Sequence, residues 1–507
     1  MKLYRPVWTC GRFNAKALIA IYYNLIEGIA YTFEESSALV IGYILRITKG
    51  NSFELEELSD ELLIEIECLC PFIDELCCLG LLSKEPMSDE IISEHRNFKK
   101  RNKLVLEKSS YLKDSTETYK EYPIEMNDAE LFYHEKSGDI TNIMIEVTYN
   151  CSEQCIHCYN IGASRNDLKD SKRSSIKSLA LSEYKNIINQ FYERGLVKVC
   201  ITGGDPFSYS HIWDLLEFLY EKDIAIDIYT NGVSIVGQEK RLSLLFPRLV
   251  GVSLYSGDSA IHESITRRVG SWNKTISFIK NLSELAVPLV LKCCIIKSNV
   301  YSYHTVLDIG EQLGIPVQFD INVTDSVDGD KYVSKNLRIP TDIIEVILCD
   351  PIIPLSILSA VRQKEFPMLS SKQLSVSPCM AGHNSFCITP DGNLIPCCAF
   401  HYKLGDLKSE RLASILESSR NLDYWEKIHI SDLEECGHHP YCAFCSLCCG
   451  LNYSEHKDLL KASENGCHLA KIRYNLTQRI REEGYDPLHG KSVRDRLAMI
   501  KESKSDK

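Results

Sequence analysis

Three cysteines near the first third of the chain have a spacing suited to metal chemistry. They are Cys151, Cys155 and Cys158. They stand as Cys-x3-Cys-x2-Cys directly after residues 143–148, whose apolar residues alternate as in a strand. Soft thiolates suit iron–sulfur centres, so three of them could hold three irons of a cubane and leave the fourth iron open. Zinc, with His157 as a further ligand, and thiols that only pack are the alternatives.

Composition and charge narrow the class of protein. The chain has 507 residues, enough for two to four domains, with a net charge of −12 and no broad basic footprint for nucleic acid. The sequence shows neither an apolar run of membrane-spanning length nor a signal pattern. We therefore expect a cytoplasmic protein that binds neither nucleic acid nor membrane. Its 22 cysteines should be reduced there, and ten of them between Cys379 and Cys467 indicate metal.

Strands and helices alternate between about residues 139 and 330. The strand candidates are residues 143–148, 197–201, 225–229, 249–254, 289–295 and 317–321. The clearest helix is expected at residues 182–194, with one apolar stripe and Gly195 just beyond it. Six such units predict an α/β fold, a partial (β/α)6 TIM-like barrel, in which ligands gather at the C-terminal ends of the strands.

The strand ends carry further motifs, and together these resemble the radical S-adenosylmethionine (radical SAM) superfamily. The signature loop matches Cys-x3-Cys-x-aromatic-Cys, with His157 in the aromatic position and Tyr159 following it. Thr202-Gly-Gly-Asp-Pro206 resembles the family's Gly-Gly-Glu-Pro motif with Asp in place of Glu. The resemblance implies a 4Fe–4S cluster with an open iron site on the three cysteines. It also implies S-adenosylmethionine contacts at Gly203, Gly204, Asp205, Thr230, Asn231, Ser253, Asn299 and Tyr159.

The C-terminal cysteines resemble those of the SPASM domain, which holds two auxiliary 4Fe–4S clusters. Residues 390–393 predict a turn between two short strands, so the unit begins as a cysteine-bearing hairpin. The resemblance assigns Cys379, Cys397 and Cys448 to the nearer cluster. It assigns Cys436, Cys445 and Cys467 to the farther cluster, with Cys442 replacing a cysteine where this chain has His439. Cys387, Cys398 and Cys449 are extra, and a zinc ribbon is the alternative.

The N-terminal 85 residues are expected to form a winged-helix-like domain. Residues 29–33 predict a strand, residues 37–47 a helix, and residues 58–67 and 71–82 two more helices. This resembles the peptide chaperone of the pyrroloquinoline-quinone pathway, a RiPP recognition element, while a generic winged helix is the alternative. The remaining division is a charged linker at 86–138, the barrel at 139–330, a connecting segment at 331–378, the SPASM domain at 379–470, and a C-terminal helix and charged tail at 471–507.

The combined resemblance implies an enzyme that cleaves S-adenosylmethionine reductively and uses the 5′-deoxyadenosyl radical to modify a ribosomally made precursor peptide. The expected product is a thioether or another side-chain crosslink. The expected partners are a precursor with a leader and a reductant such as flavodoxin or ferredoxin. Two other functions stay open: a sulfatase-maturase-like enzyme that oxidises a Cys or Ser of a folded protein, and a non-catalytic zinc protein. The general base, and the roles of Cys387, Cys398, Cys449 and His439, do not follow from the sequence.

Overall fold

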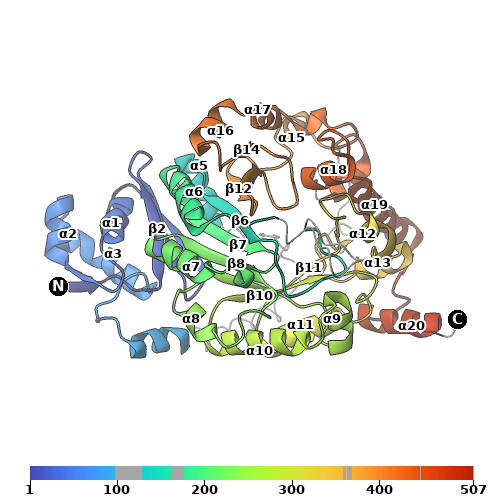
Figure 1. Cartoon of the computed structure of the whole chain (residues 1–507), viewed down its shortest axis with the longest axis horizontal. Coiled ribbons are helices and arrows are strands. Elements are labelled where there is room, and N and C mark those ends of the chain that lie inside the picture. The colour runs from blue at the N-terminus through green and yellow to red at the C-terminus, as the bar shows by residue number, and fades with distance from the viewer. Residues whose placement is uncertain (98–127, 161–175, 358–360, 362–367, 446, 506–507) are drawn as a thin grey trace.

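The computed structural model describes the whole chain except residues 98–127, 161–175, 358–360, 362–367, 446 and 506–507. Its centre is a sheet in which six parallel strands follow one another in space (Figure 1). These strands are β6 (Asn142–Thr148), β7 (Lys198–Gly203), β8 (Ala225–Thr230), β9 (Leu249–Ser253), β10 (Leu289–Cys294) and β11 (Val317–Asp320). The predicted parallel α/β sheet is therefore confirmed.

Helices cover the outer face of these strands. They are α6 (Leu181–Glu193), α7 (Ile212–Glu221), α8 (Glu239–Ser243), α9 (Ser259–Thr266), α10 (Ser271–Glu284) and α11 (His304–Leu313). On β6 the apolar residues Ile143, Ile145 and Val147 join this core, whereas Glu146 lies on the opposite face. The predicted helix at 182–194 is confirmed as α6, whose stripe buries Tyr184, Ile187, Ile188 and Phe191.

The C-terminal hairpin extends the same sheet, which the sequence did not reveal. Strand β12 (Ser385–Ile388) pairs in parallel with β6, with Cys387 opposite Met144. β13 (Asn393–Ile395) and β14 (Gly405–Asp406) then continue the sheet in antiparallel order. The predicted hairpin across residues 390–393 is confirmed, and one nine-stranded sheet carries both sets of cysteines.

The N-terminal unit has more strands than its sequence indicated. β2 (Thr9–Asn14), β3 (Ile19–Asn24) and β4 (Ile29–Glu34) form a three-stranded sheet, and β1 (Lys2–Tyr4) pairs with β5 (Ser52–Glu54). α1 (Glu35–Arg46) follows β4 as expected. The expectation of one helix over 58–67 is wrong, because α2 (Leu55–Leu62) ends at Leu63 in a left-handed conformation with φ 54° and α3 (Ile66–Cys78) then begins.

This N-terminal unit docks on the barrel through a buried interface. Side chains of β2 and β3 pack with Tyr133 of α5 (Asp128–Ser137) and with barrel residues such as Ala225 and Phe246. Lys198 Nζ lies 2.5 Å from Glu130 Oε2, and the side chains of this pair are 5% and 0% exposed. Tyr23 donates to the same carboxylate at 2.9 Å. Thus α5, at the end of the predicted linker 86–138, is part of this buried interface.

The remaining elements enclose the C-terminal ends of the strands (Figure 1). They are α12 (Tyr332–Asn336), α13 (Thr341–Ile347), α15 (Ser371–Leu374), α16 (Leu412–Ser418), α17 (Arg420–Glu426), α18 (Cys449–His456), α19 (Glu464–Glu483) and α20 (Val493–Ser505). The boundary expected at residue 470 falls inside α19, which continues from the cysteine-rich unit without a break. None of the described helices is long and apolar enough to cross a bilayer.

Changing Lys198 to Met tests the docking interface. The change would leave the Glu130 carboxylate buried without its cation, which typically costs about 3–5 kcal/mol of folding free energy. Equilibrium unfolding in urea should show this loss. The double variant Lys198→Met with Glu130→Leu should regain most of it, because no uncompensated charge remains. Equal stability of the Lys198→Met variant and the unchanged protein would contradict the buried pairing.

Candidate functional site

The signature loop leaves the C-terminal end of β6 and is bonded to the glycine turn that follows β7. The amide of Gly204 donates to Thr148 O at 2.7 Å, and the amide of Asp205 donates to Asn150 O at 2.9 Å. Gly203 has φ +128°, and a Cβ on either glycine would lie within 2.4 Å of a loop carbonyl. Only glycine fits this close approach, so the two motifs predicted at neighbouring strand ends form one unit.

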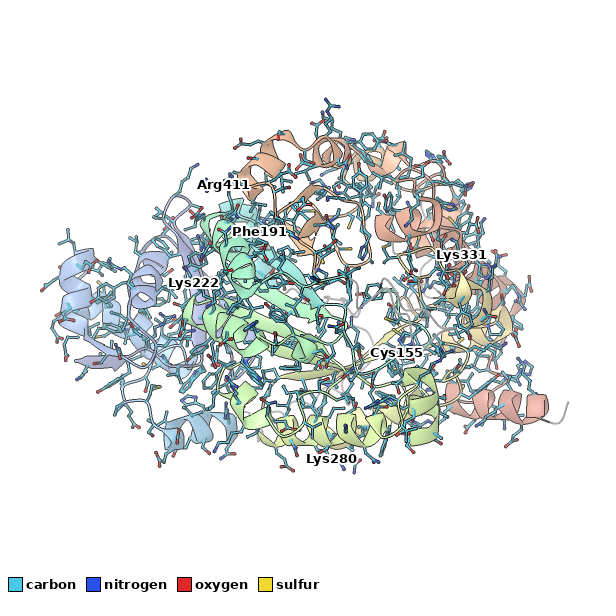
Figure 2. All side chains as sticks on the ribbon, in the orientation of Figure 1. Cys155, Phe191, Lys222, Lys280, Lys331 and Arg411 are labelled. Atoms are coloured by element: carbon cyan, nitrogen blue, oxygen red, sulfur yellow. The ribbon has the colours of Figure 1, made fainter. Side chains whose placement is uncertain are left out.

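The three loop cysteines face one another in a buried setting. Figure 2 shows Cys155 near the middle of the molecule, between the barrel strands and the C-terminal helices. Burial, Glu153 and the other two thiols raise the pKa of Cys155 well above its ordinary value. Burial, Asp205, Glu153 and Cys158 raise the pKa of Cys151 to about 12. Such thiols become thiolates only beside a strong positive charge, which iron supplies, so the donor set fits an iron–sulfur cluster.

Asp205, Thr230 and Asn231 surround this unit from the ends of β7 and β8. Thr230 Oγ1 donates to Asp205 Oδ1 at 2.6 Å, and burial raises the pKa of the Asp205 carboxyl. Asn231 Nδ2 donates to Cys151 Sγ at 3.3 Å. The structure therefore gathers five predicted contact residues beside the loop: Gly203, Gly204, Asp205, Thr230 and Asn231. Their contacts with S-adenosylmethionine remain a prediction.

Asn299 is hydrogen-bonded to backbone groups, unlike the five residues that lie beside the loop. Its Nδ2 donates to Tyr255 O at 2.9 Å and to Cys294 O at 3.0 Å, while Oδ1 accepts from Ile296 N at 2.8 Å. The amide is thus committed to the backbone that ends β9 and β10. It fixes Tyr255, whose ring packs edge-to-face on His157 with centroids 4.6 Å apart. Asn299 positions the loop in this way, and Ser253 lies at the end of β9 just before Tyr255.

Tyr159 turns away from the loop cysteines toward the C-terminal hairpin. Burial, then Cys398 and Glu146, raise the pKa of Tyr159 well above its ordinary value, and its hydroxyl is hydrogen-bonded to the Cys398 thiol. Its carbonyl accepts from Val327 N at 2.9 Å. Tyr159 therefore links the signature loop to the cysteine-rich hairpin, and a direct contact with S-adenosylmethionine stays a prediction.

The C-terminal cysteines separate into two groups. Cys379, Cys397 and Cys448 form the first group: Cys448 and Cys379 contribute, after burial and Cys398, to raising the pKa of Cys397 well above its ordinary value. Cys449 is fully buried at the start of α18 and interacts with Cys379 and Cys448.

The second group consists of Cys436, Cys442, Cys445 and Cys467. Burial and the three neighbouring thiols raise the pKa of Cys436 to about 12, and burial, Cys467, Cys442 and Cys448 raise that of Cys445 to about 11. A small cavity of about 20 Å³ is lined by Cys436, Cys445, Cys467 and, from the first group, Cys448. The ring of His439 stacks on Tyr441, with centroids 4.8 Å apart. The structure thus brings together the thiols of each group, and their roles as ligands of two auxiliary clusters stay a prediction.

Among the described residues, no three His, Cys, Asp or Glu side chains form a group that could hold one metal ion.

The sequence did not single out several residues that lie beside the cysteines. Asn160 Nδ2 donates to Gly203 O at 2.9 Å and fixes the glycine turn. Asp320, at the end of β11, has its carboxyl pKa raised by burial. Its place after the last predicted strand was a signal that could have singled it out.

Comparison with known proteins places these features in known domains. Residues 145–301 match the radical SAM superfamily, and residues 379–449 match the SPASM family, described as an iron–sulfur cluster-binding domain. The antilisterial bacteriocin subtilosin biosynthesis protein AlbA of Bacillus subtilis is 23% identical over 319 residues, covering 61% of this chain and 68% of AlbA. The mycofactocin maturase of Mycolicibacterium smegmatis is 26% identical, over 27% of this chain and 33% of the maturase.

A solved structure shares the fold over most of the chain. Streptococcus suis SuiB bound to precursor peptide SuiA superimposes with a TM-score of 0.50 and 14% identity, covering 92% of this chain and 100% of SuiB. The cofactors are S-adenosylmethionine, a 4Fe–4S cluster and auxiliary iron–sulfur clusters. The protein is thus an enzyme that carries a radical SAM domain followed by a SPASM domain.

Proposed function

We propose that this enzyme modifies a ribosomally made precursor peptide and forms a thioether or another side-chain crosslink. One observation carries the proposal: a three-thiol loop and a second cysteine-rich unit stand on the same sheet, beside an N-terminal unit with a strand edge that no described strand pairs with. The names of two similar proteins support it, since AlbA serves bacteriocin biosynthesis and SuiB binds a precursor peptide.

The ligand assignment that we propose follows the three thiol groups. Cys151, Cys155 and Cys158 hold the cluster that binds S-adenosylmethionine. Cys379, Cys397 and Cys448 hold the nearer auxiliary cluster, and Cys436, Cys442, Cys445 and Cys467 hold the farther one. The mutual proximity of the thiols within each group supports this division.

The surrounding residues prepare a dry and ordered site. When bound, the cluster and S-adenosylmethionine supply a carbon-centred radical that removes a hydrogen atom from the substrate. The chain must position the target carbon and exclude water and other hydrogen donors. An apolar cluster surrounds the loop for this purpose: Ile156, Tyr255, Ile265, Ile296, Val323, Val333 and Leu337. Asp205 and the glycine turn orient the aminocarboxyl end of S-adenosylmethionine in this proposal.

The N-terminal unit offers the leader a place to bind. β4 pairs with β3 alone among the described residues, so its outer edge can accept an extended leader as a further strand. α1 packs against this sheet, and Phe33 of β4 also meets Phe72 of α3, with ring centroids 5.8 Å apart. Glu27, Glu34 and Glu35 flank the edge and favour a leader with Lys or Arg.

The leader would raise the local concentration of the core peptide at the site. A low-potential donor such as flavodoxin or ferredoxin completes the proposed set of partners, since reductive cleavage requires an external electron. No described contact identifies its docking surface.

The proposed role of the signature loop is tested by changing Cys151, Cys155 and Cys158 together to Ala. We expect 5′-deoxyadenosine formation to stop, because the cluster that reduces S-adenosylmethionine has lost its ligands, while the auxiliary iron stays bound. Chromatography of the products and iron analysis measure both. The measured control is the unchanged protein reconstituted in parallel. Deoxyadenosine formed by the reconstituted triple variant would refute the assignment.

The number of clusters is tested by iron analysis of the anaerobically reconstituted chain. Three cubanes require about 12 irons. Changing Cys436 and Cys445 to Ala should remove about four irons and leave deoxyadenosine formation in place. A content near four irons in the unchanged chain would contradict the auxiliary ligand sets, and two zinc ions per chain would favour a ribbon.

The leader site is tested by Phe33→Ala and Phe72→Ala. Each removes an aromatic wall beside the β4 edge, so leader affinity should fall about tenfold, equivalent to about 1.4 kcal/mol. Fluorescence anisotropy of a labelled leader measures it. Tyr424→Ala, which removes an aromatic ring that is 49% exposed on α17, is the matched control.

Cleavage of S-adenosylmethionine without peptide should be unchanged in all three variants. Deleting residues 1–85 tests the leader site less well than these point variants do, because the truncation would also expose the buried interface between the N-terminal unit and the barrel. If both variants bind leader as tightly as the unchanged protein does, β4 is not the leader site.

A further inference from the structure

One buried arginine lies among the auxiliary cysteines. Arg473 of α19 is 2% exposed and lines the cavity that Cys436, Cys445 and Cys467 also line. Its Nη1 donates to Phe444 O at 3.4 Å, directly before Cys445 in the chain. A guanidinium keeps its charge even when buried, so this position places a fixed cation beside the proposed farther cluster.

The charge of Arg473 acts on two neighbours. It lowers the pKa of Cys445 and the pKa of Asp320 at the end of β11. In both groups burial acts in the opposite direction and raises the pKa. Arg473 thus lies between the end of the central sheet and a proposed ligand of the farther cluster.

The N-terminal end of α19 adds positive potential from the other side. Ser463 caps this 20-residue helix by accepting from Gly466 N at 3.0 Å, and Cys467 lies in its first turns. A Cβ on Gly466 would lie 3.9 Å from Cys445 Sγ, which places the start of the helix against that thiol. The free amides at a helix N-terminus carry partial positive charge.

Negative charges near the cluster lie on its outer side. Glu435 and Glu455 raise the pKa of Cys467, while Lys471 opposes them. Glu435, Glu464 and Lys471 line an outer recess of about 340 Å³ that is open to solvent. Water and salt screen the exposed Glu435 and Lys471, and the half-buried Glu455 is paired with Arg338 at 3.3 Å, whereas the buried guanidinium is screened much less.

We infer that Arg473 raises the reduction potential of the farther auxiliary cluster and so makes that cluster easier to reduce. This inference rests on the proposed function. When a substrate carbon radical bonds to a thiol sulfur, the S–H bond breaks, its proton leaves to a base, and one electron must depart. An oxidised iron–sulfur cluster would be a one-electron acceptor for it. A fixed cation beside the cluster favours its reduced, more negative form.

The test is a redox titration of the reconstituted full chain followed by electron paramagnetic resonance. The triple variant of Cys151, Cys155 and Cys158 identifies the auxiliary signals. Arg473→Met, which removes the charge at similar volume, should lower the midpoint potential of one auxiliary cluster. The expected shift corresponds to at least a tenfold change in the ratio of reduced to oxidised cluster, or about 59 mV for one electron. Arg473→Lys keeps the charge and should stay near the unchanged value.

Glu435→Gln is the matched control, because it removes a screened negative charge from the outer side and should raise the potential slightly. An unchanged potential in Arg473→Met, with its full iron content, would overturn the inference and leave the ligand assignment standing. Loss of the cluster from both Arg473 variants would also overturn it, since it would assign Arg473 to assembly through its hydrogen bonds. Auxiliary iron that does not depend on Cys445 would instead refute the proposed function's ligand set.

Discussion

The parallel pairing of β6 with a strand on each side is the constraint on which the site depends. On one side β7 brings the glycine turn to the signature loop, and on the other β12 brings the cysteine-rich hairpin to the same edge of the sheet. Parallel strands place their C-terminal ends together, so three segments far apart in sequence meet without a dedicated scaffold. The hydrogen bond between the Tyr159 hydroxyl and the Cys398 thiol then links the signature loop to the hairpin.

Burial of many thiols gives the site its second physical property. A thiol held away from water stays protonated, and each neighbouring thiol makes ionisation of the next one harder. In the described part of the chain, cations beside these groups are few, and Arg473 is the buried one that the described cavity contains. These thiols therefore ionise only when bound iron supplies positive charge. Cluster assembly is in this way coupled to the local fold.

The parallel sheet, α6 and the hairpin at 390–393 were predictable because each depends on local periodicity or turn chemistry. The pairing of β12 with β6 was not, since it joins strands more than 230 residues apart and no local pattern encodes such a contact. Strand β3 escaped notice because all its residues are buried and show no alternation, and β2, which is buried only in its first half, shows none either. The role of Asn299 was also hidden, because an amide that contacts a ligand and one that ties backbone together look the same in sequence.

The docked N-terminal unit has a consequence for substrate geometry. Its sheet is fixed to the barrel by an apolar interface and by the hydrogen bond from Tyr23 to Glu130, the partner of Lys198, so it cannot swing freely. If the leader binds at β4, the fold fixes the distance from the leader's binding site to the reacting carbon. Under the proposed function, the spacer between leader and core peptide would set which side chain reaches the radical by its length in residues.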